Sequence, residues 1–345
     1  MTNAFTPIND LGEFGLIDRI RAVLGAPTDE AVRMGIDDDA AVYHIGDGRV
    51  HLVTTDAMIE GVHFDRAFMP MAHLGQKIMA VNVSDVVAMN AQPRFATIAL
   101  GLPANFSVEM VEALYGGIRE ACETYGVTLL GGDTTAARYL TLSVTLIGEA
   151  AEDAVVYRRG ARVGDLLCVT GDLGGAYAGL QILLDQHRAL KETKNQFEPD
   201  LEPFRYVIHR QLTPQARLPA IEDWAKRGVR PRALIDISDG LASEVNHLCR
   251  QSGCGALVRV PALPLDPETR AVADQMMEDV DTFALFGGED YELLFALAPE
   301  DLDKLDPTTL SVIGEFTEAS HGIRVQSPLG EVIPLEAAGY RHFEE

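Results

Sequence analysis

Apolar residues follow two different spacings along this chain. Recurrence every three or four positions predicts amphipathic helices, and short apolar runs beside turn residues predict strands. The first spacing predicts helices over residues 13–24, 73–89, 107–125, from about 176, 214–227 and 241–251. The second predicts strands over residues 41–45, 49–54, 94–101, 127–130, 140–148, 166–170, 233–237, 256–260 and within 287–298. Ser107 is the expected N-cap of the third helix.

Strands and helices alternate in both halves of the chain. This pattern predicts a mixed α/β (α+β) fold of two α/β domains, with mixed sheets flanked by helices. The segment 151–165 is the predicted junction, so we expect domains over residues 1–150 and 151–345. A length of 345 residues agrees with two domains. Residues 185–203 are polar and predict a surface excursion whose role the sequence does not define.

The composition is that of an ordinary globular protein with an acidic surface. The chain is 47% hydrophobic and 23% charged, with a formal net charge of −24. This charge argues against nucleic acid and anionic membranes as partners. Acidity is also common among cytosolic enzymes, so the charge alone does not define a function. An anionic substrate would require cations at its site.

The cysteines and the N-terminal segment bear on the cellular compartment. Cys249, Cys254 and His247 are close in sequence, but their spacing matches no zinc motif. Free thiols in a reducing cytosol explain the scattered cysteines better. The N-terminus has no basic region followed by an apolar segment, and no apolar run is long enough to cross a membrane. We therefore expect a cytoplasmic protein with no membrane contact.

Carboxylates in short, turn-like segments beside apolar stretches are the main candidates for chemistry. They are Asp38, Asp39, Asp56, Asp85, Asp133, Asp236 and Asp239. Acids at strand ends, with glycine and hydroxyl side chains beside them, favour a site of hard oxygen ligands. Such a site repels itself unless cations occupy it. Each acid taken singly fits an Asx-turn or a helix cap as well, but the whole set predicts Mg²⁺ and phosphate chemistry.

Common nucleotide-binding motifs are absent from the sequence. The chain has no Gly-x-x-x-x-Gly-Lys-Ser/Thr and none of the protein-kinase signatures. The glycine-rich turn at 171–175 opens a helix and could hold an anion, although packing of a tight turn explains it better. Arg158 and Arg159 could clamp a phosphate or could be solvated turn residues. His63 follows the loop that carries Asp56 and is a second open case.

Several motifs together resemble one family, the thiamine-monophosphate kinases, which have the aminoimidazole-ribonucleotide-synthetase type of fold. The matching stretches lie in order over nearly the whole chain. They are GEFGLI, GIDDDAA, TTDAMIEGVHF, VNVSDVVAMNAQP, LLGGDTT, RRGARVGD, IDISDGL, SGCGA, GGEDYELLF and the final GYRHF.

The resemblance implies a role for individual residues and a set of ligands. It implies that several Mg²⁺ ions bind to Asp39, Thr54, Thr55, Asp56, Asp85, Asp133, Asp236 and Asp239. It implies ATP contacts at Gly132, Asp133, Arg158 and Ser238, and substrate contacts at His63 and Glu289. It also implies a homodimer formed through the N-terminal ATP- and Mg-binding domain. The number of Mg²⁺ ions does not follow from the sequence.

The chain departs from the family pattern at two positions. The family usually has glycine where this chain has Asp37, so the acidic turn carries an additional charge. The family usually has an aromatic residue where this chain has Ala337, and Tyr340 is the candidate replacement for stacking on the thiamine ring.

The hypothesis that follows is direct, in-line transfer of the ATP γ-phosphoryl group to thiamine monophosphate, which gives thiamine diphosphate and ADP. The acceptor is already an anionic phosphate oxygen, so we assign no residue as a general base. One alternative is another ATP-using enzyme of the same fold, such as an aminoimidazole-ribonucleotide synthetase. A non-catalytic sensor that binds Mg-nucleotide is the alternative from a different class.

Overall fold

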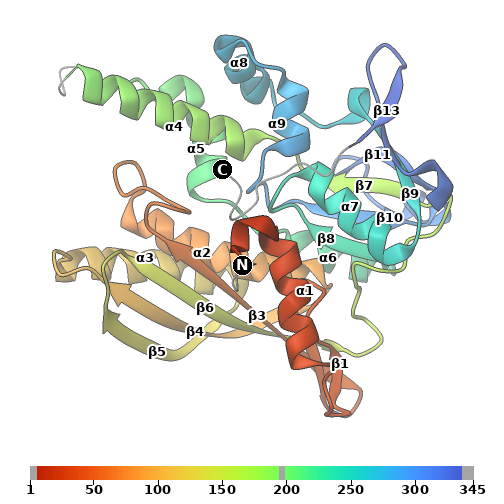
Figure 1. The fold of residues 1–345 in the computed structure, drawn as a ribbon, viewed down its shortest axis with the longest axis horizontal. Coiled ribbons are helices and arrows are strands. Elements are labelled where there is room, and N and C mark those ends of the chain that lie inside the picture. The colour runs from red at the N-terminus through yellow and green to blue at the C-terminus, as the bar shows by residue number, and fades with distance from the viewer. Residues whose placement is uncertain (1–5, 194–198, 336–345) are drawn as a thin grey trace, which may run out of the picture.

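The computed structural model describes residues 6–193 and 199–335 and contains two mixed β-sheets (Figure 1). The first sheet lies in the N-terminal half. Its strands, in spatial order, are β1 (Val32–Met34), β2 (Ala41–Gly46), β3 (Arg49–Ile59), β6 (Thr141–Ala151), β4 (Gln92–Leu102) and β5 (Thr128–Ala136). Only the β4–β5 pair is parallel. The expected mixed α/β fold is therefore confirmed for this half.

The second sheet lies in the C-terminal half and is also mixed. Its strands, in spatial order, are β13 (Val332–Pro334), β12 (Ile323–Gln326), β9 (Gly255–Arg259), β11 (Leu310–Thr317), β7 (Leu166–Thr170), β10 (Leu293–Leu297) and β8 (Ala233–Asp236). β9 and β12 pair in parallel, and the other pairs are antiparallel. The mixed sheet expected for the C-terminal half is also confirmed.

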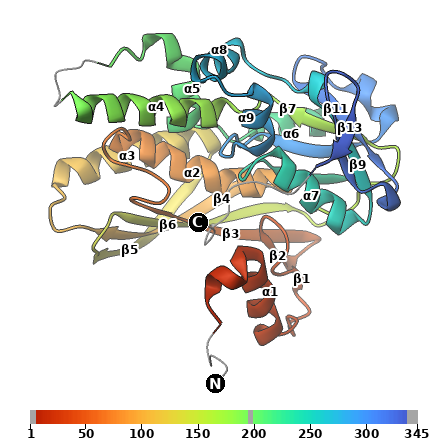
Figure 2. The same ribbon diagram turned by 45° about the horizontal axis from the view of Figure 1, so that its top comes forward.

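Helices flank both sheets. They are α1 (Gly12–Leu24), α2 (Met71–Ala88), α3 (Val108–Tyr125), α4 (Gly175–Glu192), α5 (Arg205–Leu212), α6 (Leu218–Lys226), α7 (Leu241–Ser252), α8 (Pro267–Met276) and α9 (Val280–Phe286). α2 and α3 cover one face of the first sheet (Figure 2), and α7 packs against the second sheet. Within the described ranges, no helix is both long and apolar enough to span a bilayer.

Alternation along β3 shows which face of the first sheet is buried. Val50 and Leu52 are fully buried towards α2, whereas Thr55 lies on the opposite face and is exposed. The same alternation continues on β6, where Leu142 and Val144 are buried. One face of this sheet therefore forms the core, and the other is left to small and hydroxyl-bearing side chains.

α2 is the central helix of the molecule. Of its 18 residues 13 are buried, because it contacts β3, β4 and β6 on one side and β8, α5 and α6 on the other. It crosses α3 closely at two glycines, Gly75 and Gly117. A Cβ at Gly75 would lie 2.2 Å from the Leu114 carbonyl oxygen, and one at Gly117 would lie 1.8 Å from the Ala72 carbonyl oxygen. Only glycine permits this approach.

Most of the predicted elements are present, and Ser107 caps α3 by accepting from the Met110 amide. Three predictions are wrong. Residues 185–192 continue α4 rather than forming a polar excursion, residues 214–217 form a loop between α5 and α6, and β3 and β5 extend well beyond their predicted ends. The polar stretch was misread because the outer face of an amphipathic helix is itself polar.

Candidate active site

A cavity of about 1090 Å³ lies where elements of both halves meet. Its walls include α1, the turn at residues 36–39, β3, the loop at 61–69, α2, α4, the end of α5, the loop after β8, α7 and residues 288–291. These elements come from both halves of the sequence, so the site exists only when the two halves are packed together. The cavity is large enough for drug-sized ligands.

Three carboxylates that line this cavity converge. Asp39 comes from the turn before β2, Asp85 from the C-terminal part of α2 and Asp236 from the end of β8. One carboxylate oxygen of each residue lies within 4.8 Å of one from each of the others. The fold therefore brings together three of the candidate acids, which are separated by 46 and 151 residues in the sequence.

Hydroxyl groups fix the orientation of two of these acids. The Thr54 Oγ1 donates a hydrogen bond of 2.5 Å to the Asp85 Oδ2. The Ser84 Oγ donates one of 2.5 Å to the Asp236 Oδ2 and so joins α2 to the second sheet. Thr54 is buried on β3 beside Asp85, so the structure brings these two candidate residues together.

The acids repel one another and are poorly solvated. Burial, followed by the charge of Asp39, raises the pKa of Asp236 from 3.8 to about 7. Burial, followed by the charges of Asp56 and Asp236, raises the pKa of Asp85 well above 3.8. Burial also raises the pKa of Asp38 to about 7. The charged forms of these carboxyls therefore require compensating cations.

The donor set fits a hard divalent cation such as Mg²⁺. The Asp39 Oδ2 is buried and has no hydrogen-bond partner among the described residues. Buried polar atoms in native proteins normally have a partner. Three carboxylates with oxygen atoms this close offer only oxygen ligands, which is the chemistry Mg²⁺ prefers.

Arg158 supplies the one guanidinium that pairs with this acidic group in the described part of the chain. It binds the Asp39 Oδ1 through Nη2, and through Nε at 3.2 Å, and its backbone amide donates to the Asp38 carboxylate at 3.3 Å. Arg159 lies instead over the Tyr157 ring at 5.3 Å. Arg158 is therefore the arginine of this pair that belongs to the cavity.

Most of the remaining predicted residues also line the cavity. They are Thr55, Asp56, His63, Ser238, Asp239 and Glu289. The His63 Nδ1 accepts from the Ile59 amide at 3.1 Å, which leaves the proton on Nε2. The Thr55 Oγ1 donates to the Val144 carbonyl oxygen at 3.0 Å, so its hydroxyl is directed towards β6. The Asp239 amide donates to the Glu244 Oε1.

Gly132 and Asp133 are not brought to the cavity of this chain. Both lie within β5, on the edge of the sheet, and Gly132 stands in register with Ile98 of β4. A Cβ at Gly132 would lie 1.8 Å from the Ile98 carbonyl oxygen, so close strand packing requires this glycine. Asp56 was likewise expected just after a strand, but it lies within β3, whereas Asp85 lies near the end of the helix predicted over residues 73–89. For Asp56 and Asp133, the short apolar run before the acid was wrongly taken as the whole strand.

Asp37 occupies a backbone conformation that favours glycine, with φ of 145°. This agrees with the glycine that the family usually has there. Its carboxylate pairs with Arg21 of α1, and its carbonyl oxygen accepts from the Gln251 side chain at 2.6 Å. The additional charge therefore holds α1 beside the cavity. Ala337 and Tyr340 lie outside the described residues.

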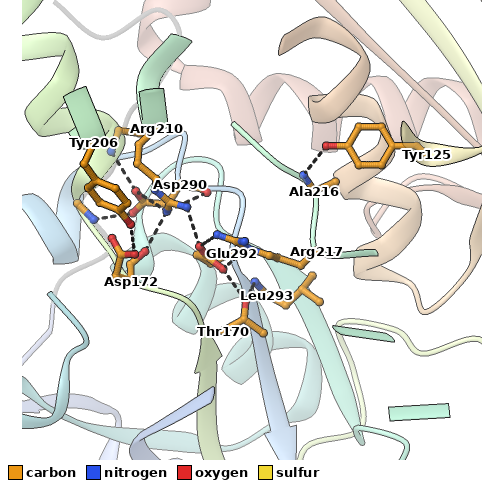
Figure 3. Close-up of polar contacts among 12 residues, drawn as sticks. Tyr125, Thr170, Asp172, Tyr206, Arg210, Ala216, Arg217, Asp290, Glu292 and Leu293 are labelled. Atoms are coloured by element: carbon orange, nitrogen blue, oxygen red, sulfur yellow. Dashed lines mark hydrogen bonds and ion pairs between the residues drawn. The ribbon is translucent and has the colours of Figure 1, made fainter. Parts of the chain in front are cut away.

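A buried network of charges anchors the segment that carries Glu289 (Figure 3). The Glu292 carboxylate is fully buried and accepts from Arg210 Nη1 at 2.8 Å, Arg217 Nε at 2.6 Å and Thr170 Oγ1 at 2.7 Å. Charge-assisted bonds of this kind are short and geometrically specific. They fix the start of β10 against α5 and β7.

The neighbouring carboxylate, Asp290, explains the glycine-rich turn. Its Oδ2 accepts from the Gly174 amide at 2.8 Å and its Oδ1 from the Ala176 amide at 3.4 Å, at the N-terminus of α4. An internal carboxylate therefore occupies the place where an anionic ligand would bind. The turn at 171–175 has a packing role, as favoured from sequence.

Sequence reasoning missed several residues of the site. Lys77 is fully buried on α2 behind the cavity residue Glu289, and its Nζ donates to the Glu289 Oε2 at 3.0 Å. A lysine inside an apolar helix was the available signal. Gln211, Glu244 and His247 also line the cavity, but polar residues at helical spacing give no such signal. Burial, followed by the Arg158 charge, lowers the pKa of His247 to about 4, so its imidazole is neutral at pH 7.

Two mixed sheets enclosing an acidic cavity define the class of proteins related to AIR synthase. The family model described as "AIR synthase related protein, N-terminal domain" matches residues 37–150, and the model for the C-terminal domain matches residues 162–326.

Within that class, the chain is similar over nearly its whole length to several thiamine-monophosphate kinases. A thiamine-monophosphate kinase of Aquifex aeolicus (strain VF5) is 36% identical over 97% of this chain and 99% of the relative. One of Bacillus subtilis (strain 168) is 32% identical over 91% and 94%. The solved structure of AaThiL complexed with AMPPCP and TMP has a TM-score of 0.84 and 35% identity, and covers 99% of this chain and 100% of that chain. The chain belongs to the thiamine-monophosphate kinase family.

Proposed function

We propose that this protein transfers the γ-phosphoryl group of ATP to thiamine monophosphate and releases thiamine diphosphate and ADP. The observation that carries the proposal is the convergence of Asp39, Asp85 and Asp236 in a cavity shared by both halves. The relatives named thiamine-monophosphate kinase, and the related structure with AMPPCP and TMP, support the choice of reaction.

For this reaction the protein mainly has to align the two ligands and compensate their negative charge. The attacking group is a phosphate oxygen that is already anionic, so no side chain has to remove a proton. Bound Mg²⁺ would neutralise the repulsion between two phosphorylated ligands and stabilise the charge of the transition state. The task of the chain is to keep the two ligands aligned and to hold Arg158 beside Asp39.

The proposal divides the cavity residues by ligand. Mg²⁺ is bound by Asp39, Thr54, Thr55, Asp56, Asp85, Asp236 and Asp239. ATP is bound by Arg158 and Ser238, and thiamine monophosphate by His63 and Glu289. Glu289 is held next to the loop after β8, because its amide donates to the Ser238 carbonyl oxygen at 2.7 Å. This bond keeps the two ligand sites adjacent.

We also propose a homodimer formed through the outer face of the first sheet. Asp56, Val144, Ile98 and Gly132 stand in one row across four strands, so Gly132 and Asp133 lie about 14 Å from Asp56. If these two residues bind ATP or metal, they do so in the cavity of a second copy. The exposed, small side chains of this face support such an interface.

The described cysteines are all free thiols, which supports the cytoplasm as the location. A turnover assay with ATP, Mg²⁺ and thiamine monophosphate tests the function, and thiamine without phosphate serves as the control acceptor. We expect stoichiometric ADP and thiamine diphosphate with the first acceptor and none with the second. ADP release that does not depend on thiamine monophosphate would contradict the proposal.

The shared cavity can be tested by mixing two inactive variants, Asp56→Asn and Asp133→Asn. Random reassembly of a homodimer gives hybrids in which one cavity has neither substitution, so about a quarter of the wild-type activity returns. Light scattering gives the oligomeric state in parallel. A monomer, or a mixture that stays inactive although hybrids form, would contradict the shared cavity.

A further inference from the structure

Gln211 presents a buried hydrogen-bond acceptor to the cavity that the chain itself does not use. It is the penultimate residue of α5, is only 4% exposed and lines the cavity. Its Oε1 has no hydrogen-bond partner among residues 6–193 and 199–335. A buried acceptor without a partner costs about 1–3 kcal/mol, so such an atom in a binding cavity indicates a ligand that donates to it.

The orientation of the Gln211 amide is fixed by chemistry. Its Nε2 donates to the Glu289 Oε2 at 2.8 Å. A carboxylate only accepts hydrogen bonds, so a rotated amide would place two acceptor oxygens against each other. The oxygen of the amide, and not its nitrogen, is therefore the atom without a partner.

Glu289 presents a second acceptor beside it. Both hydrogen bonds that other described residues make to this carboxylate end on Oε2, one from Gln211 and one from the Lys77 Nζ at 3.0 Å. The same Lys77 ammonium donates to the Gln211 carbonyl oxygen at 2.9 Å. One fully buried lysine thus holds the backbone of one acceptor residue and the carboxylate of the other.

The pair is rigidly held. Arg210, the residue before Gln211, is bound to the buried Glu292, and the amide of Glu289 donates to the Ser238 carbonyl oxygen. Glu289 has a φ of 64°, a left-handed conformation that persists in a non-glycine residue only when its surroundings enforce it. Two acceptors that are preorganised in this way favour a ligand group that carries N–H donors.

Thiamine monophosphate has one such group, the exocyclic amine on its pyrimidine ring. Resting on the proposed function, we infer that Gln211 determines specificity: its Oε1 and the Glu289 carboxylate accept hydrogen bonds from that amine. Lys77 positions both acceptor residues through its hydrogen bonds to the Gln211 carbonyl oxygen and the Glu289 carboxylate. A pyrimidine that carries an oxo group at the same position would set an acceptor against acceptors and be rejected.

The experiment compares two acceptors in two proteins. The acceptors are thiamine monophosphate and its analogue in which an oxo group replaces the exocyclic amine. The wild-type protein should prefer the amine by about 100-fold or more in kcat/KM. The nearly isosteric Gln211→Met should raise KM for thiamine monophosphate about tenfold. It should also bring kcat/KM for the amine and for the oxo analogue close to each other. The KM for ATP should not change.

Gln215→Met, at an exposed position of the loop after α5, is the matched control and should retain the wild-type preference. Gln211→Asn keeps an amide but withdraws it by one methylene, and it should behave like Gln211→Met. Thermal melts establish that each variant is folded.

The outcomes separate this inference from the proposed function. A wild-type protein that phosphorylates thiamine monophosphate, together with a Gln211→Met preference equal to its own, would overturn the role of Gln211 alone. If no turnover occurs, the proposed function fails. Calorimetric titration of thiamine and its oxo analogue into both proteins then decides on Gln211: a preference for the amine that Gln211→Met abolishes supports the role, and equal binding overturns it.

Discussion

At the scale of single residues, the acids of the cavity are held in a state that costs stability. Asp236 is buried, lies close to Asp39 and Asp85, and has a pKa raised to about 7. Natural proteins keep such groups where a ligand compensates them, because an unpaired buried charge is costly. Loss of one carboxylate should therefore affect stability and activity in opposite directions.

Asp236→Asn should raise the thermal midpoint of the metal-free protein at pH 8 by a few degrees, since it removes a repelled charge but keeps an acceptor for Ser84. The same change should lower kcat by about 10²–10³-fold, because a cation ligand is lost. Melting curves in the presence of a chelator and turnover assays measure the two effects. A variant that is both less stable and inactive would indicate a structural role.

Lys77→Met should raise KM for thiamine monophosphate about tenfold while KM for ATP stays constant. The reason is that the Lys77 ammonium donates to the Glu289 carboxylate and to the Gln211 backbone, which belong to the proposed site for thiamine monophosphate. Lys304→Met is the control, because Lys304 forms an exposed pair with Asp301 and should leave both constants unchanged. Equal changes in both KM values would mean that Lys77 supports the whole fold rather than one ligand site.

At the scale of elements, α2 joins the two ligand sites. It carries Lys77 near its start and Asp85 near its end, and it crosses α3 through Gly75 and Gly117. The sequence indicated the helix and its length almost fully. It did not indicate the two close glycine contacts, since a glycine within a helix looks the same whether it faces solvent or another backbone.

Adjacent glycines of α3 provide a matched pair of variants. Gly117→Ala should destabilise the protein by about 3 kcal/mol, because the added Cβ would lie 1.8 Å from the Ala72 carbonyl oxygen. Gly116→Ala meets nothing within 4 Å and should stabilise by up to about 1 kcal/mol. Denaturant unfolding measures both free energies. Similar values for the two variants would show that α2 and α3 separate without cost.

At the scale of the whole molecule, hydrogen bonds join the two halves that form the cavity. Ser84 binds Asp236, and the Tyr125 hydroxyl accepts from the Ala216 amide at 3.0 Å (Figure 3). A continuous apolar cluster also contains residues of both sheets. The stability of the cavity and that of the fold are therefore linked, and protons and cations should affect both.

The metal-free protein should become less stable as pH rises from about 6 to 8. The pKa values of Asp38 and Asp236 are raised from 3.8 to about 7, so the folded state binds protons that the unfolded chain releases near pH 4. Their stabilisation is present at low pH and is lost as pH rises through the folded-state pKa. Mg²⁺ should raise the thermal midpoint more at pH 8 than at pH 6, because protons then compete less. A midpoint that rises between pH 6 and 8 without metal would contradict this.

The sequence by itself determined the mixed α/β class, most elements and the residue types of the site. Spacing and propensity are local properties, and acids such as Asp39 and Asp236 stand out beside apolar runs. The tertiary structure alone decided which of these acids meet, because convergence depends on how two sheets pack around α2. It placed Asp133 on a distant edge strand, and it brought Gln211 and Lys77 to Glu289 across 78 and 212 positions of sequence. Contacts at such separations leave no local pattern for a sequence to reveal.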